Sequence, residues 1–383
     1  MRESERRAST LQIGFIVAGR QTPAAGSERY FWDLLEALPS TGIDVHGLVV
    51  GDPEITRASN AAVESFAPEG GSAVARVKAL RRAVSRNIGR NHIVVSHHAQ
   101  HALPVLDVVR SRPLVVHCHG PLVREGRSEG MSVKELMMRS LAERLVYARA
   151  QRIIVLSHAF GKILQDDYHV PASKIRIVPG GVDLTRFQLG VSKADARRRL
   201  GWPTDRPLFF TARRLAPTKG IDRLVDAMSE ILSAAPSTLL VIAGSGPLTA
   251  QLQQRVRELG LEACVRFAGY VDERTLRLMY RAADALIVPT VALEGFGLVV
   301  VEALACGTPA LVTPVSGLPE VVRDLDPRLV LAGSEPVDIA RGIIAVVSGE
   351  QKLPDTAACR AYAERFDWRK IASRVGDVYH EVA

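Results

Sequence analysis

The sequence predicts an α/β protein built from two doubly wound parallel-sheet domains, and three observations lead to this prediction. Short apolar runs alternate with amphipathic segments along most of the chain, the order expected of a parallel sheet covered by helices. This alternation restarts after residues 191–207, where charged residues, Gly and Pro replace the apolar runs. The length of 383 residues also suits two domains. We therefore expect an N-terminal domain over residues 1–190 and a C-terminal domain over residues 191–366.

The first domain is predicted to begin with a strand, a turn, a helix and a second strand. The apolar run Leu11–Ala18 is typical of a buried parallel strand. The turn Gly19–Ser27, the helix Glu28–Leu38 and the strand Val45–Val50 are expected to follow. Gly26, at the start of the helix, lets the backbone approach a phosphate or a sugar. An ordinary turn between a strand and a helix explains the same residue.

A basic amphipathic helix is predicted over Val74–Ile88. Its apolar residues recur at helical spacing, and no acid interrupts the cations between them. The cations are Arg76, Lys78, Arg81, Arg82, Arg86 and Arg90. Such a helix can lie on an anionic membrane, or it can simply expose its charged face to water. Residues 1–190 carry 25 Lys and Arg against 18 Asp and Glu, and this bias favours membrane contact through residues 76–90.

Histidines follow the next two predicted strands, Ile93–Ser96 and Leu114–Cys118. The first strand is followed by His97, His98 and His101, and the second contains or precedes His117 and His119. Doubly wound sheets bind their ligands at the carboxyl ends of the strands. Neither histidine group alone has zinc-type spacing with Cys or carboxylate partners, so no metal is predicted. His119, before Gly120-Pro121, is the better active-site candidate, although alternation places His117 on the same side of the strand.

The chain after these histidines is predicted to form a loop and then three further elements. The polar, Gly-containing segment Leu122–Ser132 is expected to be a loop beside the site that covers the acceptor. A long helix, Val133–Ala150, should lead to the strand Arg152–Leu156. A helix over Ala159–Tyr168 and a strand over Ile175–Val178 complete the first domain.

The second domain repeats the same order, and three of its strands lead into glycine-containing turns. The strand Leu208–Thr211 precedes a basic loop and the helix Ile221–Ala234. The strands Leu239–Ala243 and Val265–Ala268 lead into turns, and the helix Glu273–Arg281 follows. The turns are Gly244-Ser245-Gly246-Pro247 and Gly269-Tyr270-Val271. Arg214 and Lys219, five residues apart in the basic loop, could converge on a diphosphate, whereas isolated pairs of this kind are usually solvated.

The stretch 289–313 combines a glycine loop with two carboxylates. The apolar strand Ala285–Val288 leads to Glu294-Gly295-Phe296-Gly297, the helical run Leu298–Ala305 and the strand Ala310–Val312. Unpaired amides at a helix N-terminus bind anions, while carboxylates accept hydrogen bonds from sugar or ribose hydroxyls. Glu294 and Glu302 bracket the loop, so a nucleotide-sugar fits this stretch. A buried helix with an acidic residue near its start is the alternative.

Composition limits the other classes of function. Cys118, Cys264, Cys306 and Cys359 form no paired motif, which is typical of a reducing compartment. The N-terminus lacks the apolar core of a signal peptide, and no apolar stretch is long enough to span a bilayer. We expect a cytoplasmic protein that is soluble or peripheral on the inner face of the membrane. Aromatic residues make up only 5%, so the sequence offers few stacking surfaces for nucleic acid.

Together these motifs resemble a family 4 glycosyltransferase of the GT-B fold. The resemblance runs through most of the chain. It rests on His117–Pro121 (HCHGP), Pro179–Phe187 (PGGVDLTRF), residues 213–220 (RRLAPTKG), Gly244–Pro247 (GSGP), Gly269–Val271 (GYV), residues 294–309 (EGFGLVVVEALACGTP) and Phe366–Trp368 (FDW). The glutamate pair with the Arg/Lys loop is the specific part, whereas each of the other turns is weak alone.

The resemblance implies two Rossmann-like domains that face a central cleft, with a final helix, residues 367–383, returning to the first domain. It implies a retaining transferase that uses a UDP- or GDP-linked sugar without a metal or other cofactor. His119, Arg214, Lys219 and Glu294 would be the catalytic residues, with His119 beside the sugar. The donor site would contain Gly26, Arg214, Lys219, Gly244, Gly246, Tyr270, Val271, Glu294, Gly295, Phe296, Gly297, Leu298 and Glu302. The acceptor would be a glycan, a lipid-linked glycan or a small molecule.

Two other functions remain open from the sequence. A nucleotide-sugar epimerase of the same fold would bind a similar ligand, but it would need acid and base carboxylates and no acceptor site. A non-enzymatic binder of anionic polymers would account for the net charge of +8. Epimerised donor without acceptor would favour the first alternative, and strongly salt-dependent binding of random oligonucleotides the second.

Overall fold

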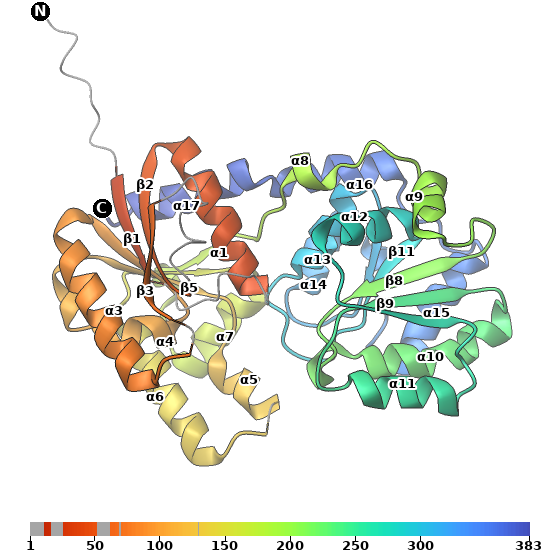
Figure 1. Ribbon diagram of the computed structural model, residues 1–383, viewed down its shortest axis with the longest axis horizontal. Coiled ribbons are helices and arrows are strands. Elements are labelled where there is room, and N and C mark those ends of the chain that lie inside the picture. The colour runs from red at the N-terminus through yellow and green to blue at the C-terminus, as the bar shows by residue number, and fades with distance from the viewer. Residues whose placement is uncertain (1–10, 17–25, 52–61, 69, 129) are drawn as a thin grey trace, which may run out of the picture. The chain divides into compact units, whose positions relative to one another are not determined.

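The computed structural model describes residues 11–16, 26–51, 62–68, 70–128 and 130–383 (Figure 1). The chain divides into two compact units. The first unit holds Met1–Gly181 and Trp368–Ala383, and the second holds Val182–Asp367. Each unit has its own parallel sheet.

The first unit contains a seven-stranded sheet in the order β3-β2-β1-β4-β5-β6-β7, with every neighbouring pair parallel. Its strands are β1 (Leu11–Ile16), β2 (Ile43–Val50), β3 (Ala62–Ala67), β4 (Ile93–His97), β5 (Leu114–Cys118), β6 (Arg152–Val155) and β7 (Ile175–Ile177). All residues of β4 and β5 are buried, which explains their continuous apolar runs. The edge strand β3 was not predicted, because Glu64 and Ser65 interrupt its apolar residues.

The helices of this unit are α1 (Gly26–Ala37), α3 (Ala73–Asn87), α4 (Ala99–Ala102), α5 (Leu122–Ser128), α6 (Val133–Arg149), α7 (His158–Tyr168) and α17 (Trp368–His380). The C-terminal helix α17 packs beside α1, although more than three hundred residues separate them in sequence (Figure 1). Most of the predicted turn Gly19–Ser27 lies outside the described residues. Gly26 is the first residue of α1.

Residues 122–128 form the helix α5, where we expected a polar loop, so that prediction was wrong. The carboxylate of Glu143 accepts a hydrogen bond from the backbone N–H of Leu122 at 2.9 Å. Tyr168 also donates to Glu143, at 2.5 Å. Glu143 comes from the next helix and is 1% exposed. A buried acid at the start of α5 therefore stabilises the helix through a contact that the local composition does not reveal.

The second unit contains a five-stranded parallel sheet in the order β10-β9-β8-β11-β12. The strands are β8 (Leu208–Ala212), β9 (Leu239–Ala243), β10 (Val265–Gly269), β11 (Ala285–Val288) and β12 (Ala310–Val312). The helices are α8 (Leu184–Phe187), α9 (Lys193–Leu200), α10 (Ile221–Ala234), α11 (Thr249–Glu258), α12 (Glu273–Ala282), α13 (Leu298–Ala305), α14 (Leu318–Val322), α15 (Pro336–Val347) and α16 (Thr356–Ala363). The predicted alternation of strands and helices is confirmed here.

The chain passes between the units at residues 181–182 and again at 367–368, rather than in the polar stretch 191–207. Gly181 lies so close to the indole ring of Trp368 that an added Cβ would approach it to 2.5 Å. On the other side, the N–H of Val182 donates to the carbonyl of Phe366 at 2.8 Å. The two passages therefore run side by side, and a side chain at position 181 would not fit.

None of the helices in the described part of the chain is long and apolar enough to cross a bilayer.

Candidate functional site

The candidate site of the second unit lies where its sheet changes direction. From β8, the strands β9 and β10 extend to one side of the sheet, and β11 and β12 extend to the other. Such a switch point leaves a crevice at the carboxyl ends of the two central strands, where doubly wound sheets bind ligands. Arg213, Arg214 and Lys219 follow β8, and Glu294 follows β11. The predicted basic loop and the predicted glutamate loop are therefore neighbours.

Two cations converge on one carboxylate oxygen at this point. Lys219 Nζ lies 3.0 Å from Oε2 of Glu294, and Nη2 of Arg213 donates to the same oxygen. The side chains of Arg213 and Glu294 are 6% and 15% exposed, and that of Lys219 is 24% exposed. Because the three groups share a poorly solvated space, their attraction is much stronger than that of a surface ion pair.

The protonation state of Glu294 follows from this surrounding. Burial alone would raise the pKa of Glu294, but the charges of Arg213 and Lys219 outweigh burial and lower this pKa to about 2. Glu294 is thus a carboxylate at neutral pH and acts as a hydrogen-bond acceptor. With two cations and one anion, the cluster keeps a net positive charge that suits an anionic ligand.

Arg213 is the site residue that the sequence analysis missed. It is buried at 9% exposure, and its Nη1 is buried without a hydrogen-bond partner in the described part of the chain. A buried guanidinium N–H is rarely left unpaired, which marks this atom as a candidate ligand donor. Arg214, the residue predicted instead, is exposed. The signal that could have identified Arg213 is the doubled arginine directly after an apolar strand.

Backbone hydrogen bonds connect the basic loop, residues 213–220, to the loop that contains Glu294. The carbonyl of Thr218 accepts from the N–H of Val291 at 3.0 Å. Gly220 adopts φ of +65° and lies against the carbonyl of Pro289, where an added Cβ would be only 1.9 Å from the oxygen. A glycine is therefore required beside Lys219 to let these loops meet. The carbonyl of Glu294 in turn accepts from Gly317, in the loop after β12.

The predicted donor glycines Gly244 and Gly246 also have a structural role. A Cβ on Gly244 would lie 2.0 Å from the carbonyl oxygen of Arg213, and one on Gly246 would lie 2.4 Å from that of Leu215. The N–H of Leu215 donates to the carbonyl of Ser245 at 3.0 Å. These glycines thus let the turn after β9 pack closely against the basic loop, and this packing positions Arg213.

Glu302 lies in α13 and is 5% exposed. The hydroxyl of Tyr280 donates to its Oε2 at 2.8 Å. Gly297 is the N-cap of α13, with φ of +87°, and as a glycine it has no side chain that could cap the helix. Phe296 is buried against Phe366, with ring centroids 5.6 Å apart, so its side chain belongs to the core.

The remaining predicted donor residues of this unit differ in exposure. Gly295 is buried, whereas Leu298 and Val271 are half-buried. Tyr270 is 85% exposed, directly after Gly269, whose carbonyl accepts from the N–H of Gly244 at 2.7 Å. Tyr270 is thus at the same sheet edge as the glycine turn and is free of packing constraints from the core.

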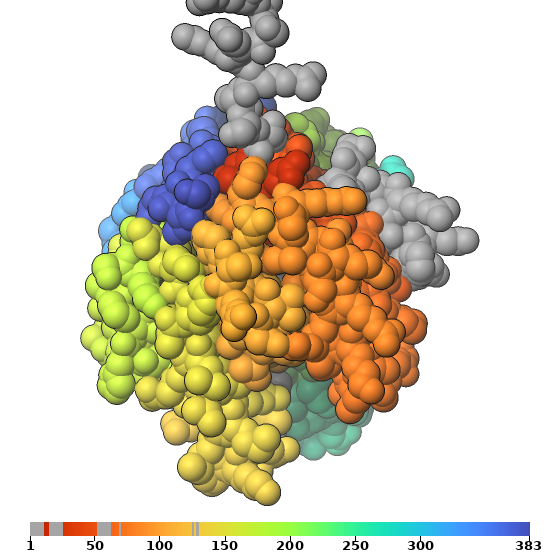
Figure 2. All heavy atoms as spheres, turned by 90° about the vertical axis from the view of Figure 1, so that its left-hand side faces the viewer, coloured from red at the N-terminus to blue at the C-terminus, as the bar shows by residue number. Residues whose placement is uncertain are grey.

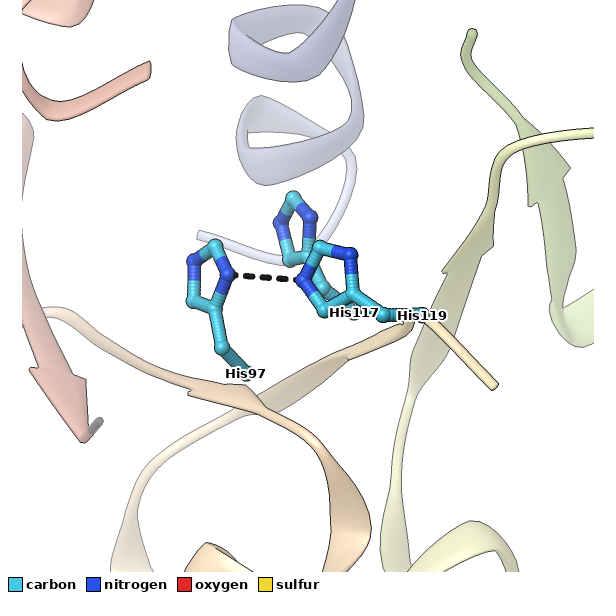
Figure 3. Close-up of side chains that lie close together, drawn as sticks. All are labelled: His97, His117 and His119. Carbon is cyan, nitrogen blue, oxygen red and sulfur yellow. Dashed lines mark hydrogen bonds between the residues drawn. The ribbon is translucent and has the colours of Figure 1, made fainter. Parts of the chain in front are cut away.

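The other two predicted site residues, His119 and Gly26, belong to the first unit. That sheet changes direction between β1 and β4. His119 follows β5 and is half-buried, and its ring lies edge-on to that of Tyr30 from α1, with centroids 4.8 Å apart. Gly26 is exposed at the start of the same helix. His119 also contacts His97, which comes from the neighbouring strand β4 (Figure 3).

Comparison with known proteins relates both units to one class of enzyme. Residues 192–366 match the model of glycosyl transferases group 1, and residues 24–186 match the model of glycosyltransferase family 4. A D-inositol 3-phosphate glycosyltransferase of Streptomyces bingchenggensis is 32% identical over 281 residues, which cover 70% of this chain and 61% of that protein. A second D-inositol 3-phosphate glycosyltransferase, from Catenulispora acidiphila, is 33% identical over 251 residues, which cover 63% of this chain and 58% of that protein. The chain spans about three fifths of the length of the curated relatives that it matches.

Solved structures share the arrangement of elements. Anabaena HepE in complex with UDP and glucose superposes with a TM-score of 0.80 at 21% identity, covering 97% of this chain and all of that one. Sucrose-phosphate synthase from Thermosynechococcus elongatus gives a TM-score of 0.75 at 24% identity, covering 97% and 98%. At these identities the likeness concerns the fold.

The two parallel sheets confirm the predicted fold class, and the two family models together account for most of the described chain. The motifs that suggested the resemblance lie within the matched ranges or directly beside them. The chain therefore belongs to the family 4 glycosyltransferases, whose fold is GT-B.

Proposed function

We propose that the protein transfers a sugar from a UDP- or GDP-linked donor to a hydroxyl of a glycan, lipid-linked or small-molecule acceptor, with retention of configuration. The observation that carries this proposal is the cation pair at the switch point of the second unit. Arg213 and Lys219 are held on the buried Glu294, and one guanidinium nitrogen remains without a partner. This arrangement suits a diphosphate, and family membership supplies the reaction class.

In the proposed reaction, negative charge develops on the departing diphosphate, beside these cations. In the transfer step, the bond between the anomeric carbon and the diphosphate oxygen breaks, and a bond to the acceptor oxygen forms on the same face. The acceptor proton passes to a departing phosphate oxygen. Negative charge then accumulates on the diphosphate, and Arg213, Arg214 and Lys219 stabilise it without the reorganisation that water would require.

The other predicted residues take roles consistent with their positions. Glu294 holds both cations in place and can accept a hydrogen bond from a sugar hydroxyl with its second oxygen. Glu302, bonded to Tyr280, is proposed to bind the ribose hydroxyls. His119 is proposed to lie beside the transferred sugar. The site uses no cofactor in this proposal.

Relatives suggest which ligands to test first. One HepE structure contains UDP and glucose, a second contains UDP, and a third contains UDP-glucose. These ligands favour UDP over GDP as the donor nucleotide. Several relatives are named for D-inositol 3-phosphate, an acceptor whose phosphate would suit the basic first half of this chain. We propose a phosphate-bearing or membrane-associated acceptor on this basis.

A thermal-shift experiment with UDP, GDP, ADP and their common sugar conjugates tests the donor site. A ligand at one hundred times its Kd stabilises the folded protein by about 2.7 kcal/mol, which raises Tm by several degrees in a domain of this size. We expect one nucleoside diphosphate to raise Tm without added metal, and one sugar conjugate to raise it further. The Lys219→Ala variant should show a smaller shift with the same ligands. Equal shifts in both proteins, or none in the wild type, would contradict the assigned site.

The membrane contact predicted for residues 76–90 stays a prediction. The structure indicates a weaker attraction between these residues and anionic lipid than the sequence alone suggests. The guanidinium of Arg81 donates to both carboxylate oxygens of Asp107, at 2.7 and 2.6 Å, and Arg86 pairs with Glu64. Two of the six cations between residues 76 and 90 are therefore partly neutralised within the protein. Their attraction to anionic lipid is weaker than the sequence suggests.

The helix α6 offers a second surface for the same contact. Five large apolar side chains lie exposed along it: Val133 (74%), Met137 (69%), Met138 (64%), Leu141 (61%) and Leu145 (52%). Helical spacing places Lys134 and Arg144 on the same face, and no acidic residue lies there. The segment that contains α5 and α6 is at the surface in Figure 2, in yellow at the lower edge. Apolar residues with only cations among them favour an anionic bilayer, which we propose as the partner of this face.

Sedimentation with vesicles of phosphatidylglycerol and phosphatidylcholine tests this contact. We expect Leu141→Ser with Leu145→Ser to reduce the bound fraction at least tenfold, because both residues would insert into the interface. Val337→Ser, which alters an exposed apolar residue of α15 (46% exposed), is the control and should bind normally. Unchanged binding of the α6 variant would contradict the contact. A concentration-dependent dimer without vesicle binding would instead assign the face to a second copy of the chain.

A further inference from the structure

Three histidines from two strands converge in the first unit. His97 and His117 are direct partners in the register of the parallel strands β4 and β5. Their side chains project from the same face, and their rings stack with centroids 4.4 Å apart and an interplanar angle of 11°. His119 lies two residues beyond His117, so it returns to this face, and its Nε2 is 3.0 Å from Nδ1 of His97 (Figure 3). A ligating nitrogen of each histidine lies within 4.8 Å of those of the other two.

A neighbouring side chain orients the ring of His117. The hydroxyl of Tyr379, from α17, lies 2.8 Å from Nε2 of His117. Contacts of this kind, made by groups just outside a metal's ligands, commonly orient metal-binding histidines. His97 and His117 are each 1% exposed, whereas His119 is half-buried and leaves a side from which an ion can enter.

The cluster also contains polar atoms without partners. Nδ1 of His117 has no hydrogen bond among the described residues, and neither does the hydroxyl of Tyr30, which is fully buried against the three rings. Unpaired polar atoms of this depth are uncommon, and their occurrence at one place suits a site for a ligand.

We propose that His97, His117 and His119 form a binding site for a divalent transition-metal ion such as Zn²⁺. Imidazole nitrogens are the ligands that zinc, copper and nickel accept most readily. Zinc lies about 2.0–2.1 Å from each nitrogen, so its ligating atoms are separated by roughly 3–4 Å. The ligating nitrogens lie within 4.8 Å of one another, so the stacked rings of His97 and His117 must tilt towards each other to share one ion. Three protein ligands leave a fourth position open to water or to a substrate oxygen.

A consequence of this site rests on the proposed function. His119 is proposed to contact the transferred sugar, and a ring nitrogen bound to zinc is no longer free to do so. We therefore expect Zn²⁺ to inhibit transfer. The binding itself is independent of that role and can be measured without donor or acceptor.

Titration of metal-free protein with Zn²⁺ and Co²⁺ tests the binding. We expect one equivalent of zinc to bind, measured by calorimetry, and cobalt to give the intense visible absorption of a four-coordinate ion. His97→Gln and His117→Gln should each weaken zinc binding at least a hundredfold. His158→Gln, which replaces an exposed histidine at the start of α7, is the matched control and should bind like the wild type.

Several results would overturn the proposal. Zinc affinity that is unchanged in the His97→Gln and His117→Gln variants would place any bound ion elsewhere, and less than one equivalent bound by the wild type would remove the site. Circular dichroism checks that the variants are folded. If both buried variants unfold, His119→Ala at the half-buried side provides the same test. Zinc that binds to the wild type without slowing transfer would retain the site and refute its link to the sugar.

Discussion

Replacement of Lys219 by alanine is expected to lower kcat/KM by roughly 10²–10³-fold, the usual effect of removing one electrostatic donor from a transition state. The ammonium lies 3.0 Å from Glu294 at the switch point of the sheet, beside the position proposed for the diphosphate. Its charge stabilises the leaving group most strongly when the sugar bond breaks. Initial rates with the donor identified by thermal shift, at several donor concentrations, measure the loss.

Two further variants make this result specific. Arg255→Ala, in the last turn of α11, removes a cation from an exposed ion pair with Asp226 in the same unit, and its rate should match the wild type. Arg214→Ala should lower kcat/KM while leaving Tm unchanged, because Arg214 is exposed and its predicted partner is the diphosphate. Near-normal turnover of Lys219→Ala would refute the role of this cluster in transfer.

The sequence predicted the parts of this protein that depend on local pattern. Apolar runs located most strands, and the spacing of apolar residues located α3. Glu294 and Lys219 could be predicted as neighbours because the carboxyl ends of parallel strands meet at one edge. A motif near a strand end is thus informative even before the strand order is known.

Features that depend on strand order and on distant contacts could not be predicted. The two histidine groups appeared unrelated in sequence, yet the register of β4 and β5 pairs His97 with His117. Arg213 and Arg214 are adjacent, and only their burial shows that Arg213 holds Glu294. The helix α5 depends on Glu143, which lies fifteen residues beyond its end. In each case a contact between separate elements decides the outcome.

Replacement of Glu294 by glutamine is expected to destabilise the second unit by about 3–5 kcal/mol, because it leaves two poorly solvated cations without their shared anion. The shape of the side chain is kept, so the loss reports on charge. Asp226→Asn, which breaks the exposed pair with Arg255, is the control and should cost less than about 1 kcal/mol. Urea denaturation at neutral pH measures both free energies of unfolding.

The pH dependence separates this electrostatic effect from a packing defect. The folded-state pKa of Glu294, about 2, lies below the ordinary value of 4.5, so its carboxylate stabilises the fold above pH 4.5. That stabilisation, about 3 kcal/mol for a shift of this size, is lost as the pH falls from 4.5 towards 2. The wild type should therefore lose stability across this range more steeply than Glu294→Gln, and the two curves should approach each other in acid. Parallel curves would show that the carboxylate is not paired with Arg213 and Lys219 in solution, and the diphosphate site built on that cluster would have to be abandoned.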